Sequence, residues 1–559
     1  MKISGAKIFV ETLIEQGCDV IFGYPGGQVI NLFDELYLNQ DRIKHVLTAH
    51  EQGASHAADG YARATGKVGV VLATSGPGAT NLVTGIATAY LDSIPMVAIT
   101  GNVPCSLIGR DSFQEVDIVG VTMPITKHNF IVKKVEDLAD TIRLAFKIAK
   151  SGRPGPVLID IPKDVQKSVC EFENKPVEEP YPMTKASQKL LEEASKLIAK
   201  SKKPYIYCGG GIIAGNASEE VQKLADKIDS PIGCSMMGIS AIPTDNERFL
   251  GMQGMHGHYA SSIAENEADL IIACGARFSD RATGDKSKFA KNAKIIHIDV
   301  DNAELQKNIP VYLGINGDIK DALARLVELV QEKKNPKWTE RVNQLKKEEK
   351  DMTVNPDSNA LTPFNIIDII NKNITEDTII TTDVGQHQMW AAQRCTFSKP
   401  RKFISSGGLG TMGFGMGASI GANFATGNKV VLYTGDGSFG MNLNELATAV
   451  TNNTPMVIVI MNNGVLGMVR QWQTLFFDKH YSNTTLERKT DFVKLAEAFG
   501  AKGYRVFTTD ELEEVFPKAF AENAPVVIDC AVDCNEFVLP MLPPGGSIDD
   551  IITQVGGDF

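Results

Sequence analysis

The sequence has no apolar run that approaches the roughly 20 residues needed to cross a bilayer. Its opening stretch, MKISGAKIFVETLIEQG, is interrupted by Lys7, Glu11 and Glu15, so it favours an amphipathic helix over a signal peptide. Basic residues are not in excess either. A net charge of -11 argues against nucleic acid as the main partner, although a local site can still bind an anion. We therefore expect a cytoplasmic protein with no membrane and no nucleic acid as a partner.

Cysteines are few and show no pairing pattern. The nine cysteines are odd in number and scattered, and Cys208, Cys274 and Cys530 lie in apolar, strand-like stretches. That distribution suits reduced thiols in a cytosolic protein. Cys530 and Cys534 are close enough to suggest a metal pair, but no second pair accompanies them. The cysteines therefore favour neither a disulfide framework nor a structural metal site.

Short segments rich in Val and Ile recur along the chain, each followed by Gly, Ser, Asn or Asp, with helical stretches between them. This alternation is typical of parallel strands in α/β layers, so the expected fold class is α/β. A chain of 559 residues has room for roughly three to five domains. The segments are VGVVLAT, PMVAIT, PVLIDI, PYIYCGG, ADLIIACG, KIIHID, TIITTD, KVVLYTG, PMVIVIMNN and PVVIDC.

Two stretches break this rhythm. Residues 171–187 are rich in Pro and Glu, and residues 332–363 are highly charged with Pro near each end. Both are typical of solvated connectors, the second with a helix inside. We therefore predict domains at 1–170, 188–332 and 360–559. The first and third give the impression of distant copies of one type of sheet.

A carboxylate stands on a glycine turn in KVVLYTGDGSFGMN. Asp436 follows an apolar run, and the next run, PMVIVIMNNG, ends in Asn462 and Asn463. Ligands of open α/β sheets bind beyond the carboxyl ends of strands, and two such ends could be neighbours. A carboxylate, an amide oxygen and a backbone carbonyl suit Mg²⁺ together with phosphate oxygens. Either turn alone could be an ordinary βα turn. An EF-hand does not fit, because the sequence lacks the acidic positions that an EF-hand loop requires. The pair resembles the metal–diphosphate signature of thiamine diphosphate (ThDP) enzymes.

ThDP chemistry needs a second carboxyl group, buried and bonded to the aminopyrimidine ring, to help remove the thiazolium C2 proton. In LTAHEQGASHAADGYARATGK, a helix would place Glu51 on one stripe with Ala54, Ala58 and Tyr61. A carboxylate on such an apolar face is unusual. The alternative is a helix-start Glu favoured by the helix dipole. Together with the GDG and NN turns, Glu51 is better explained as catalytic.

Several long, collinear motifs match one known family, and together they run from Gly23 to about Gly546. They are YPGGQVINLFDEL, HEQGASHAADGYARATGKVGVVLATSGPGATNLVTGIA, DSFQEVDIVGVTMPITKHNF, SGRPGPVLIDIPKDVQ, LGTMGFGMGASIGA, GDGSF and NNGVLGMVRQWQ. The chain thereby resembles the acetolactate synthase family, the large subunits of acetohydroxyacid synthase. The resemblance implies three α/β domains, each a mainly parallel sheet flanked by helices: a pyrimidine-binding, an FAD-binding and a diphosphate-binding domain.

The resemblance also implies where the cofactors bind. ThDP would lie between the first domain of one subunit and the third domain of another, which requires at least a dimer. Mg²⁺ would be held by Asp436, Asn463 and the carbonyl of Val465. Met412 would be the apolar wedge that keeps ThDP bent, and Met468 would border both cofactor and substrate channel. The other residues implied to line ThDP are Gln386, His387, Gly410, Gly437 and Ser438.

FAD would occupy the middle domain by the same resemblance. From the residues alone, CGGG after a strand is a weak nucleotide signal, and IIHIDVD places Asp299 at a strand end. In this family FAD does not serve as an electron carrier in the main reaction. The residues implied to hold FAD are Arg153, Gly209, Gly210, Gly211, Met255, His256, Gly275, Ala276, Arg277, Phe278, Asp280, Arg281, Asp299, Val300 and Asp318.

The implied reaction decarboxylates pyruvate on ThDP and joins the two-carbon unit to a second 2-oxo acid. Pyruvate gives 2-acetolactate and 2-oxobutyrate gives 2-aceto-2-hydroxybutyrate, steps of branched-chain amino acid biosynthesis. The implied catalytic residues are Glu51, Gln114, Lys163 and Trp472, with Phe113 beside them. The alternatives are another ThDP and FAD enzyme, such as a pyruvate oxidase, or a non-catalytic nucleotide-binding scaffold. A homodimer or homotetramer with a small regulatory subunit is expected.

Overall fold

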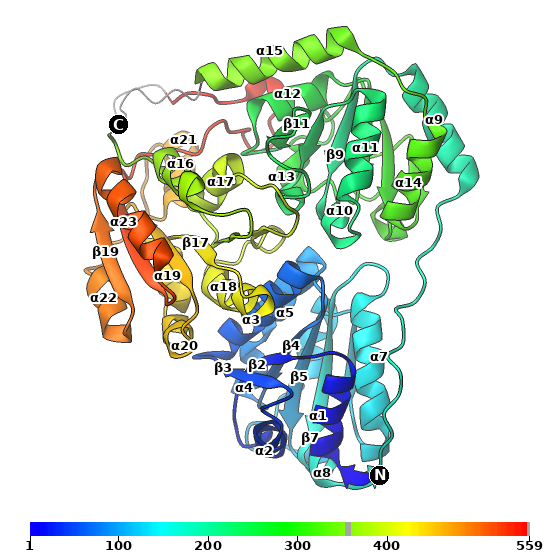
Figure 1. The fold of residues 1–559 in the computed structure, drawn as a ribbon, viewed down its shortest axis with the longest axis vertical. Helices are drawn as coiled ribbons and strands as arrows, with labels where there is room; N and C mark the ends of the chain where they lie inside the picture. Colours follow the sequence, from blue (N-terminus) through cyan, green and yellow to red (C-terminus); the bar gives the residue numbers. More distant parts are fainter. Residues whose placement is uncertain (353–358, 556–559) are drawn as a thin grey trace.

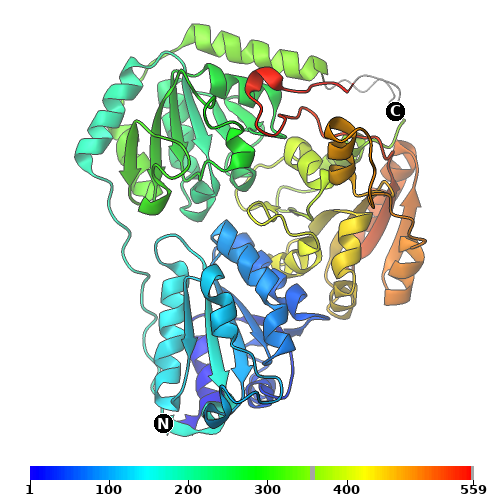
Figure 2. The ribbon, with the colours of Figure 1, turned by 180° about the vertical axis from the view of Figure 1, so that it is seen from behind.

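The computed structural model describes residues 1–352 and 359–555. Three six-stranded sheets, each flanked by helices, form three α/β domains (Figures 1 and 2). Every strand pair within these sheets is parallel, and the expected fold class is confirmed. Among the described residues, no helix combines the length and the apolar character that a membrane span requires.

The first sheet has the strand order β3-β2-β4-β5-β7-β6, and a short antiparallel pair, β1-β8, lies beside it. The expected N-terminal helix is α1, whose Glu11 and Glu15 are paired with Arg42 and Arg143. The elements are β1 (Lys2–Ser4), α1 (Gly5–Glu15), β2 (Val20–Tyr24), α2 (Ile30–Leu38), β3 (Lys44–Leu47), α3 (Glu51–Thr65), β4 (Gly69–Ala73), α4 (Pro77–Asn81), α5 (Val83–Asp92), β5 (Met96–Asn102), α6 (Ile118–Thr122), β6 (His128–Ile131), α7 (Leu138–Lys150), β7 (Pro156–Pro162), α8 (Lys163–Lys167) and β8 (Val169–Glu171).

The third sheet has the order β16-β15-β17-β18-β20-β19. Counted along each domain, this is the same order as in the first sheet, which supports the impression that the two domains share one sheet type. The elements are α16 (Pro363–Asn373), β15 (Ile379–Thr382), α17 (Gln386–Arg394), β16 (Phe403–Ile404), α18 (Phe414–Thr426), β17 (Val430–Gly435), α19 (Asp436–Asn442), α20 (Glu445–Thr451), β18 (Met456–Asn462), α21 (Gly467–Phe476), α22 (Phe492–Phe499), β19 (Lys502–Val506), α23 (Thr509–Ala521) and β20 (Val526–Ala531).

The middle sheet is wound differently, in the order β11-β10-β9-β12-β13-β14. This is the strand order of dinucleotide-binding α/β sheets, in which the ligand lies where the winding reverses, here between β9 and β12. The elements are α9 (Gln188–Lys200), β9 (Pro204–Cys208), α10 (Gly210–Ala214), α11 (Ser218–Ile228), β10 (Ile232–Cys234), β11 (Phe249–Met252), α12 (Tyr259–Glu267), β12 (Leu270–Cys274), α13 (Asp280–Thr283), β13 (Lys294–Asp299), β14 (Leu313–Asn316), α14 (Ile319–Leu329) and α15 (Pro336–Met352).

The charged stretch 332–363 is only partly a solvated connector. It contains the expected helix, α15, but one face of that helix packs on the middle domain. Trp338 and Leu345 are fully or almost fully buried there, and the Trp338 indole donates to the Pro204 carbonyl at 2.9 Å. An apolar stripe among many charges was enough to attach the helix to the sheet.

Helices α3 and α18 join the first domain to the third (Figure 1). Their backbones cross so closely that a Cβ on Gly421 would lie 1.8 Å from the Ala57 carbonyl oxygen. A Cβ on Gly60 would lie 2.2 Å from the Ala418 carbonyl oxygen. Only glycine permits such an approach, so the small-residue pattern of both motifs serves interdomain packing.

Candidate active site

The two turns singled out in the third domain lie side by side. Strands β17 and β18 are parallel neighbours, and Gly435 pairs with Met461 in the register. Asp436, the first residue of α19, and Asn463, just beyond β18, therefore project from the same edge of the sheet. The expected proximity of the two strand ends is confirmed.

Asp436 is buried and makes no salt bridge with a described cation, although, against the larger effect of desolvation, the charge of Arg488 lowers its pKa. The residue is only 7% exposed to solvent, and in the described parts of the chain no cation lies within salt-bridge distance of its carboxylate. Desolvation raises the pKa of Asp436 to about 6, although hydrogen bonds from its own amide and that of Gly437 lower it. A buried carboxylate with this electrostatic deficit, next to the amide oxygen of Asn463, is chemically suited to Mg²⁺.

The side chains expected around ThDP cluster near this edge. Gln386 donates to Gln471 at 3.0 Å and accepts from the Asn463 amide at 3.3 Å. The imidazole of His387 is buried, its Nε2 has no protein partner, and desolvation lowers its pKa to about 3. Ser438 accepts from the Gly413 amide at 3.2 Å. The site thus combines a neutral imidazole with an unpaired carboxylate.

A separate group of functional candidates lies at the carboxyl edge of the first sheet. Glu51 opens α3, and its Oε2 accepts a hydrogen bond from Asn81 at 2.9 Å. Lys163, just after β7, donates to the Gly27 carbonyl at 2.8 Å. Gln114 has a positive φ of 58° and lies over Gly76. The described hydrogen bonds connect none of these three side chains to the metal turn.

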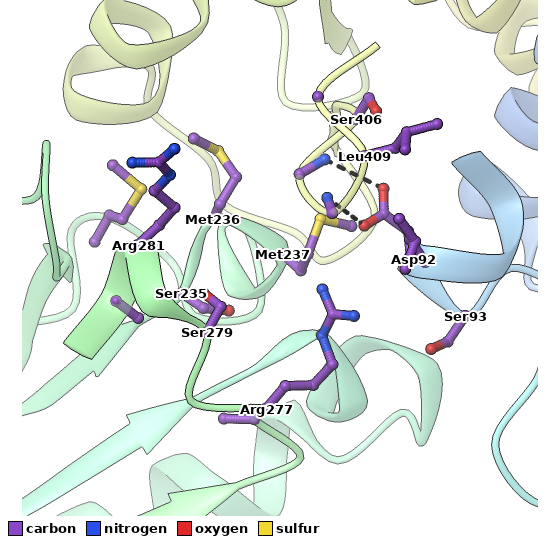
Figure 3. Close-up of a pocket in the computed structure, with 18 of the residues that line it drawn as sticks. Asp92, Ser93, Ser235, Met236, Met237, Arg277, Ser279, Arg281, Ser406 and Leu409 are labelled. Carbon is purple, nitrogen blue, oxygen red and sulfur yellow. Dashed lines mark hydrogen bonds between the residues drawn. The ribbon is translucent and has the colours of Figure 1, made fainter. Parts of the chain in front are cut away.

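A cavity of about 1320 Å³ lies where the three domains meet. Figure 3 shows part of its wall, with side chains from the first, middle and third domains pointing into it. Gly410, Met412, Met468 and Trp472 line the side formed by the third domain. The lining also includes these residues implied to hold FAD: Arg153, Gly210, Gly211, Met255, His256, Gly275, Ala276, Arg277, Phe278, Asp280, Arg281, Asp299, Val300 and Asp318.

The glycine run after β9 and the turn after β12 meet at the point where the middle sheet reverses. A Cβ on Gly209, which does not itself line the cavity, would lie 2.0 Å from the Gly275 carbonyl oxygen. The Arg277 guanidinium points into the cavity and has no ion pair among the described residues. Asp318 instead caps α14, accepting from the amides of Lys320 and Asp321. The free cation and the sheet reversal fit a dinucleotide such as FAD.

Part of the cavity wall was absent from the sequence-based prediction. Asp92 and Ser93, at the end of α5, line it together with Met236 and Met237. The loop at 406–409 completes this wall (Figure 3). Asp92 looks like an ordinary acid near a helix end, and no local pattern marks it. The backbone amides that it binds, those of Gly407 and Gly408, lie more than 300 residues away in the sequence.

The remaining candidates lie outside the cavity lining. These are Glu51, Gln114, Lys163, Gln386, His387, Asp436, Gly437, Ser438, Asn463 and Val465. The single chain therefore presents one group of candidates on the first domain and another on the third. Neither the proposed metal ligands nor Glu51 lines the cavity between the three domains.

Comparisons with known proteins agree with this architecture. Family models of thiamine pyrophosphate enzymes match residues 3–121 as the N-terminal TPP binding domain, 191–326 as the central domain and 383–530 as the C-terminal TPP binding domain. The fold and these matches define an enzyme of the class that uses thiamine pyrophosphate, another name for ThDP.

Curated relatives narrow the class. A probable acetolactate synthase large subunit of Methanocaldococcus jannaschii is 46% identical, over 99% of this chain and 96% of the relative. An acetolactate synthase large subunit of Buchnera aphidicola is 44% identical, over 98% of each. That of Haemophilus influenzae is 42% identical, over 99% of this chain and 98% of the relative. The chain therefore belongs to the acetolactate synthase large-subunit family.

Proposed function

We propose that this enzyme decarboxylates pyruvate and joins the two-carbon unit to a second 2-oxo acid, giving 2-acetolactate or 2-aceto-2-hydroxybutyrate. The observation that carries the proposal is the buried Asp436, which makes no salt bridge with a described residue, at the same sheet edge as Asn463 in a chain whose relatives are acetolactate synthases. Its place would be branched-chain amino acid biosynthesis. Bound ThDP would supply the electron sink for decarboxylation.

The chain's own residues would bind the cofactors, orient the substrates and exclude water from the site. Asp436, Asn463 and the Val465 carbonyl would hold Mg²⁺, which would anchor the diphosphate of ThDP. Glu51 would hold a proton at its carboxylate against the aminopyrimidine ring. Lys163 would offer a cation to an incoming carboxylate, with Gln114 beside it. The apolar side chains of Met412 and Met468 would shield the reacting carbon from water and so limit its protonation.

FAD is proposed as a second cofactor of the middle domain. The sheet order, the unpaired Arg277 and the size of the cavity support this assignment. Asp299 lies at the end of β13 beside the cavity, and burial raises its pKa to about 6. A hydroxyl donor from the ligand would satisfy this carboxyl group.

Product stoichiometry tests the proposed reaction. Purified protein would receive pyruvate, ThDP, Mg²⁺ and FAD, and pyruvate consumed, CO₂ released and acetolactate formed would be counted. Two pyruvates consumed per CO₂, with acetolactate formed, is the expected result. One pyruvate per CO₂, with acetaldehyde or acetyl products, would assign the protein to the decarboxylases or oxidases. Absence of both turnover and cofactor binding would favour the non-catalytic scaffold.

Trp472 is expected to select the second substrate. It lies on α21 at the cavity wall, 5.8 Å from the Arg281 guanidinium and edge-on to Phe476. Replacing Trp472 by leucine should lower the preference for 2-oxobutyrate over pyruvate by about tenfold, because the wall that contacts the extra methylene is lost. Competition between the two acceptors, with both products quantified, measures this. Phe507→Leu, which changes an exposed aromatic side chain of the same domain outside the cavity lining, is the control. An unchanged preference in Trp472→Leu would remove the assignment.

A homodimer or homotetramer is proposed because, among the described residues, no hydrogen bond joins the two groups of functional side chains. The first domain also exposes large apolar side chains, among them Phe113 at 83%, Tyr37 and Met123. Such surfaces are typical of interfaces. A partner's first domain would bring Glu51 to the third-domain site.

Mixing two impaired variants tests this shared site. Glu51→Gln and Asp436→Asn, co-expressed with different tags, should regain about a quarter of wild-type activity. If the chains pair at random, half of the dimers contain one chain of each variant. In such a dimer one of the two active sites carries both native residues. A Glu51→Gln chain mixed with the Glu51→Gln/Asp436→Asn double variant is the control and should show no activity above that of Glu51→Gln alone. No recovery in the first mixture would place both residues in the same chain's site.

A small regulatory subunit and a cytoplasmic location complete the proposal. The relatives are named large subunits, which supports a smaller partner. Co-purification of a small protein that changes the activity would support this assembly.

A further inference from the structure

One segment of the third domain borders both ends of the three-domain cavity. At residues 406–410 and at Met412 it lines the wall. Its first glycines lie against the middle domain, since a Cβ on Gly407 would lie 2.5 Å from Met237 Sδ. At its far end the Met412 methyl lies 3.9 Å from the Cβ position of Gly437, beside the metal turn. Segment 405–412 thus spans the proposed FAD side and the proposed ThDP side.

Asp92 of the first domain holds this segment in place. Its Oδ1 accepts from the Gly408 amide at 2.7 Å and its Oδ2 from the Gly407 amide at 3.2 Å (Figure 3). The Asp92 side chain is completely buried and pairs with Arg63 at 2.8 Å. Arg63 in turn donates to the Ser405 carbonyl at 2.9 Å. Hydrogen bonds to a buried carboxylate are among the strong ones in proteins, so Asp92 is a strong restraint on this loop, alongside the hydrogen bonds that Gln388 donates to it.

The next residue ties the same helix end to the middle domain. Ser93 has a positive φ of 61°, and its hydroxyl accepts from Arg153 Nε at 2.7 Å. Arg153 Nη1 donates to Glu304 at 2.6 Å and to Asp301 at 3.3 Å. Asp92 and Ser93 therefore connect the third and middle domains through two consecutive residues of the first.

We infer that Asp92 is a positioning residue that orders segment 405–412 for both cofactor half-sites. The inference rests on the proposed binding of FAD and ThDP. Because Asp92 fixes the segment before either ligand binds, neither ligand bears the cost of ordering it. Without Asp92 the ligand that binds first bears that cost and the second does not, so ThDP with Mg²⁺ then tightens FAD binding by the same factor by which FAD tightens ThDP binding.

The test measures FAD affinity by flavin fluorescence in the apoprotein, with and without ThDP and Mg²⁺. In the wild type, ThDP and Mg²⁺ are expected to change FAD affinity by less than about twofold. In Asp92→Asn FAD alone should bind more weakly, and ThDP with Mg²⁺ should tighten its binding by about fivefold or more. The reason is that an amide cannot accept hydrogen bonds on both of its arms, which leaves the segment to be ordered by the first ligand. Hydrogen exchange of the 405–412 amides should also rise about tenfold. Asp59→Asn is the matched control: Asp59 is equally buried and pairs with the same Arg63, but does not contact the segment.

A factor in Asp92→Asn equal to that of the wild type, or an equal rise in Asp59→Asn, would overturn the inference. Either outcome, with both cofactors still bound, leaves the proposed function intact. A wild type that binds neither cofactor would instead reject the proposed function. If Asp92→Asn does not fold, Thr88→Val decides in the same way. It removes the buried contact of 2.8 Å between the Thr88 and Thr411 hydroxyls at the end of the same segment.

Discussion

Replacing Glu51 by glutamine is expected to slow turnover by at least about tenfold while FAD stays bound. Glutamine preserves the shape of the side chain and can still accept from Asn81, but it cannot take up or release the proton that ThDP activation requires. Glu51 lies at the start of α3, outside the cavity that contains the proposed FAD residues. The change should therefore act on the chemical step and leave the flavin site intact.

Steady-state rates with saturating pyruvate and ThDP, together with flavin fluorescence, measure both parts of this prediction. Glu171→Gln makes the same chemical change at a carboxylate that is 79% exposed, and should leave the rate unchanged. Near-normal turnover in Glu51→Gln would show that the carboxylate is only a favourable charge at a helix N-terminus. Loss of FAD in that variant would show that its effect is structural.

The central strands were predictable from sequence because they are buried on both faces. Each of the Val- and Ile-rich runs is a strand, as in β17 and β18, where all but the last residue of β18 is buried. Several strands that the pattern missed lie at sheet edges, such as β3, β6 and β19. Most of their residues are exposed or only partly buried, so they lack a continuous apolar run. Two interior strands, β2 and β10, were missed as well. The order of the strands within each sheet could not be predicted from the sequence pattern either.

The site was predictable only where function leaves a local trace. Asp436 and Glu51 stand out because a carboxylate is unusual in an apolar or glycine-rich surrounding. Asp92 leaves no such trace, since its role arises from backbone amides of a distant segment that only the fold brings to it. The charged helix α15 shows the same limit, because a few apolar residues outweigh many charges once a sheet face is available.

Replacing Asp436 by asparagine is expected to abolish activity and yet stabilise the cofactor-free protein. Burial raises the pKa of this carboxyl from 3.8 to about 6, a difference that corresponds to about 3 kcal/mol. Because the pKa in the folded state is the higher one, its contribution to stability is present at acidic pH and is lost as the pH rises through about 6. At pH 7.5 the native protein therefore carries an unfavourable buried charge that asparagine removes. Mg²⁺ binding would offset the same charge in the wild type.

Thermal unfolding at pH 7.5 separates these contributions. Without ligands, Asp436→Asn should unfold several degrees above the wild type. Mg²⁺ with ThDP should raise the unfolding temperature of the wild type and leave that of the variant unchanged, because only the wild type binds the pair. Asp41→Asn, an exposed aspartate of the first domain, should match the wild type in every condition. A variant that Mg²⁺ and ThDP still stabilise would show that the metal lies elsewhere. A variant less stable than the wild type without ligands would show that Asp436 is already satisfied by its neighbours, and that its burial reflects folding rather than metal binding.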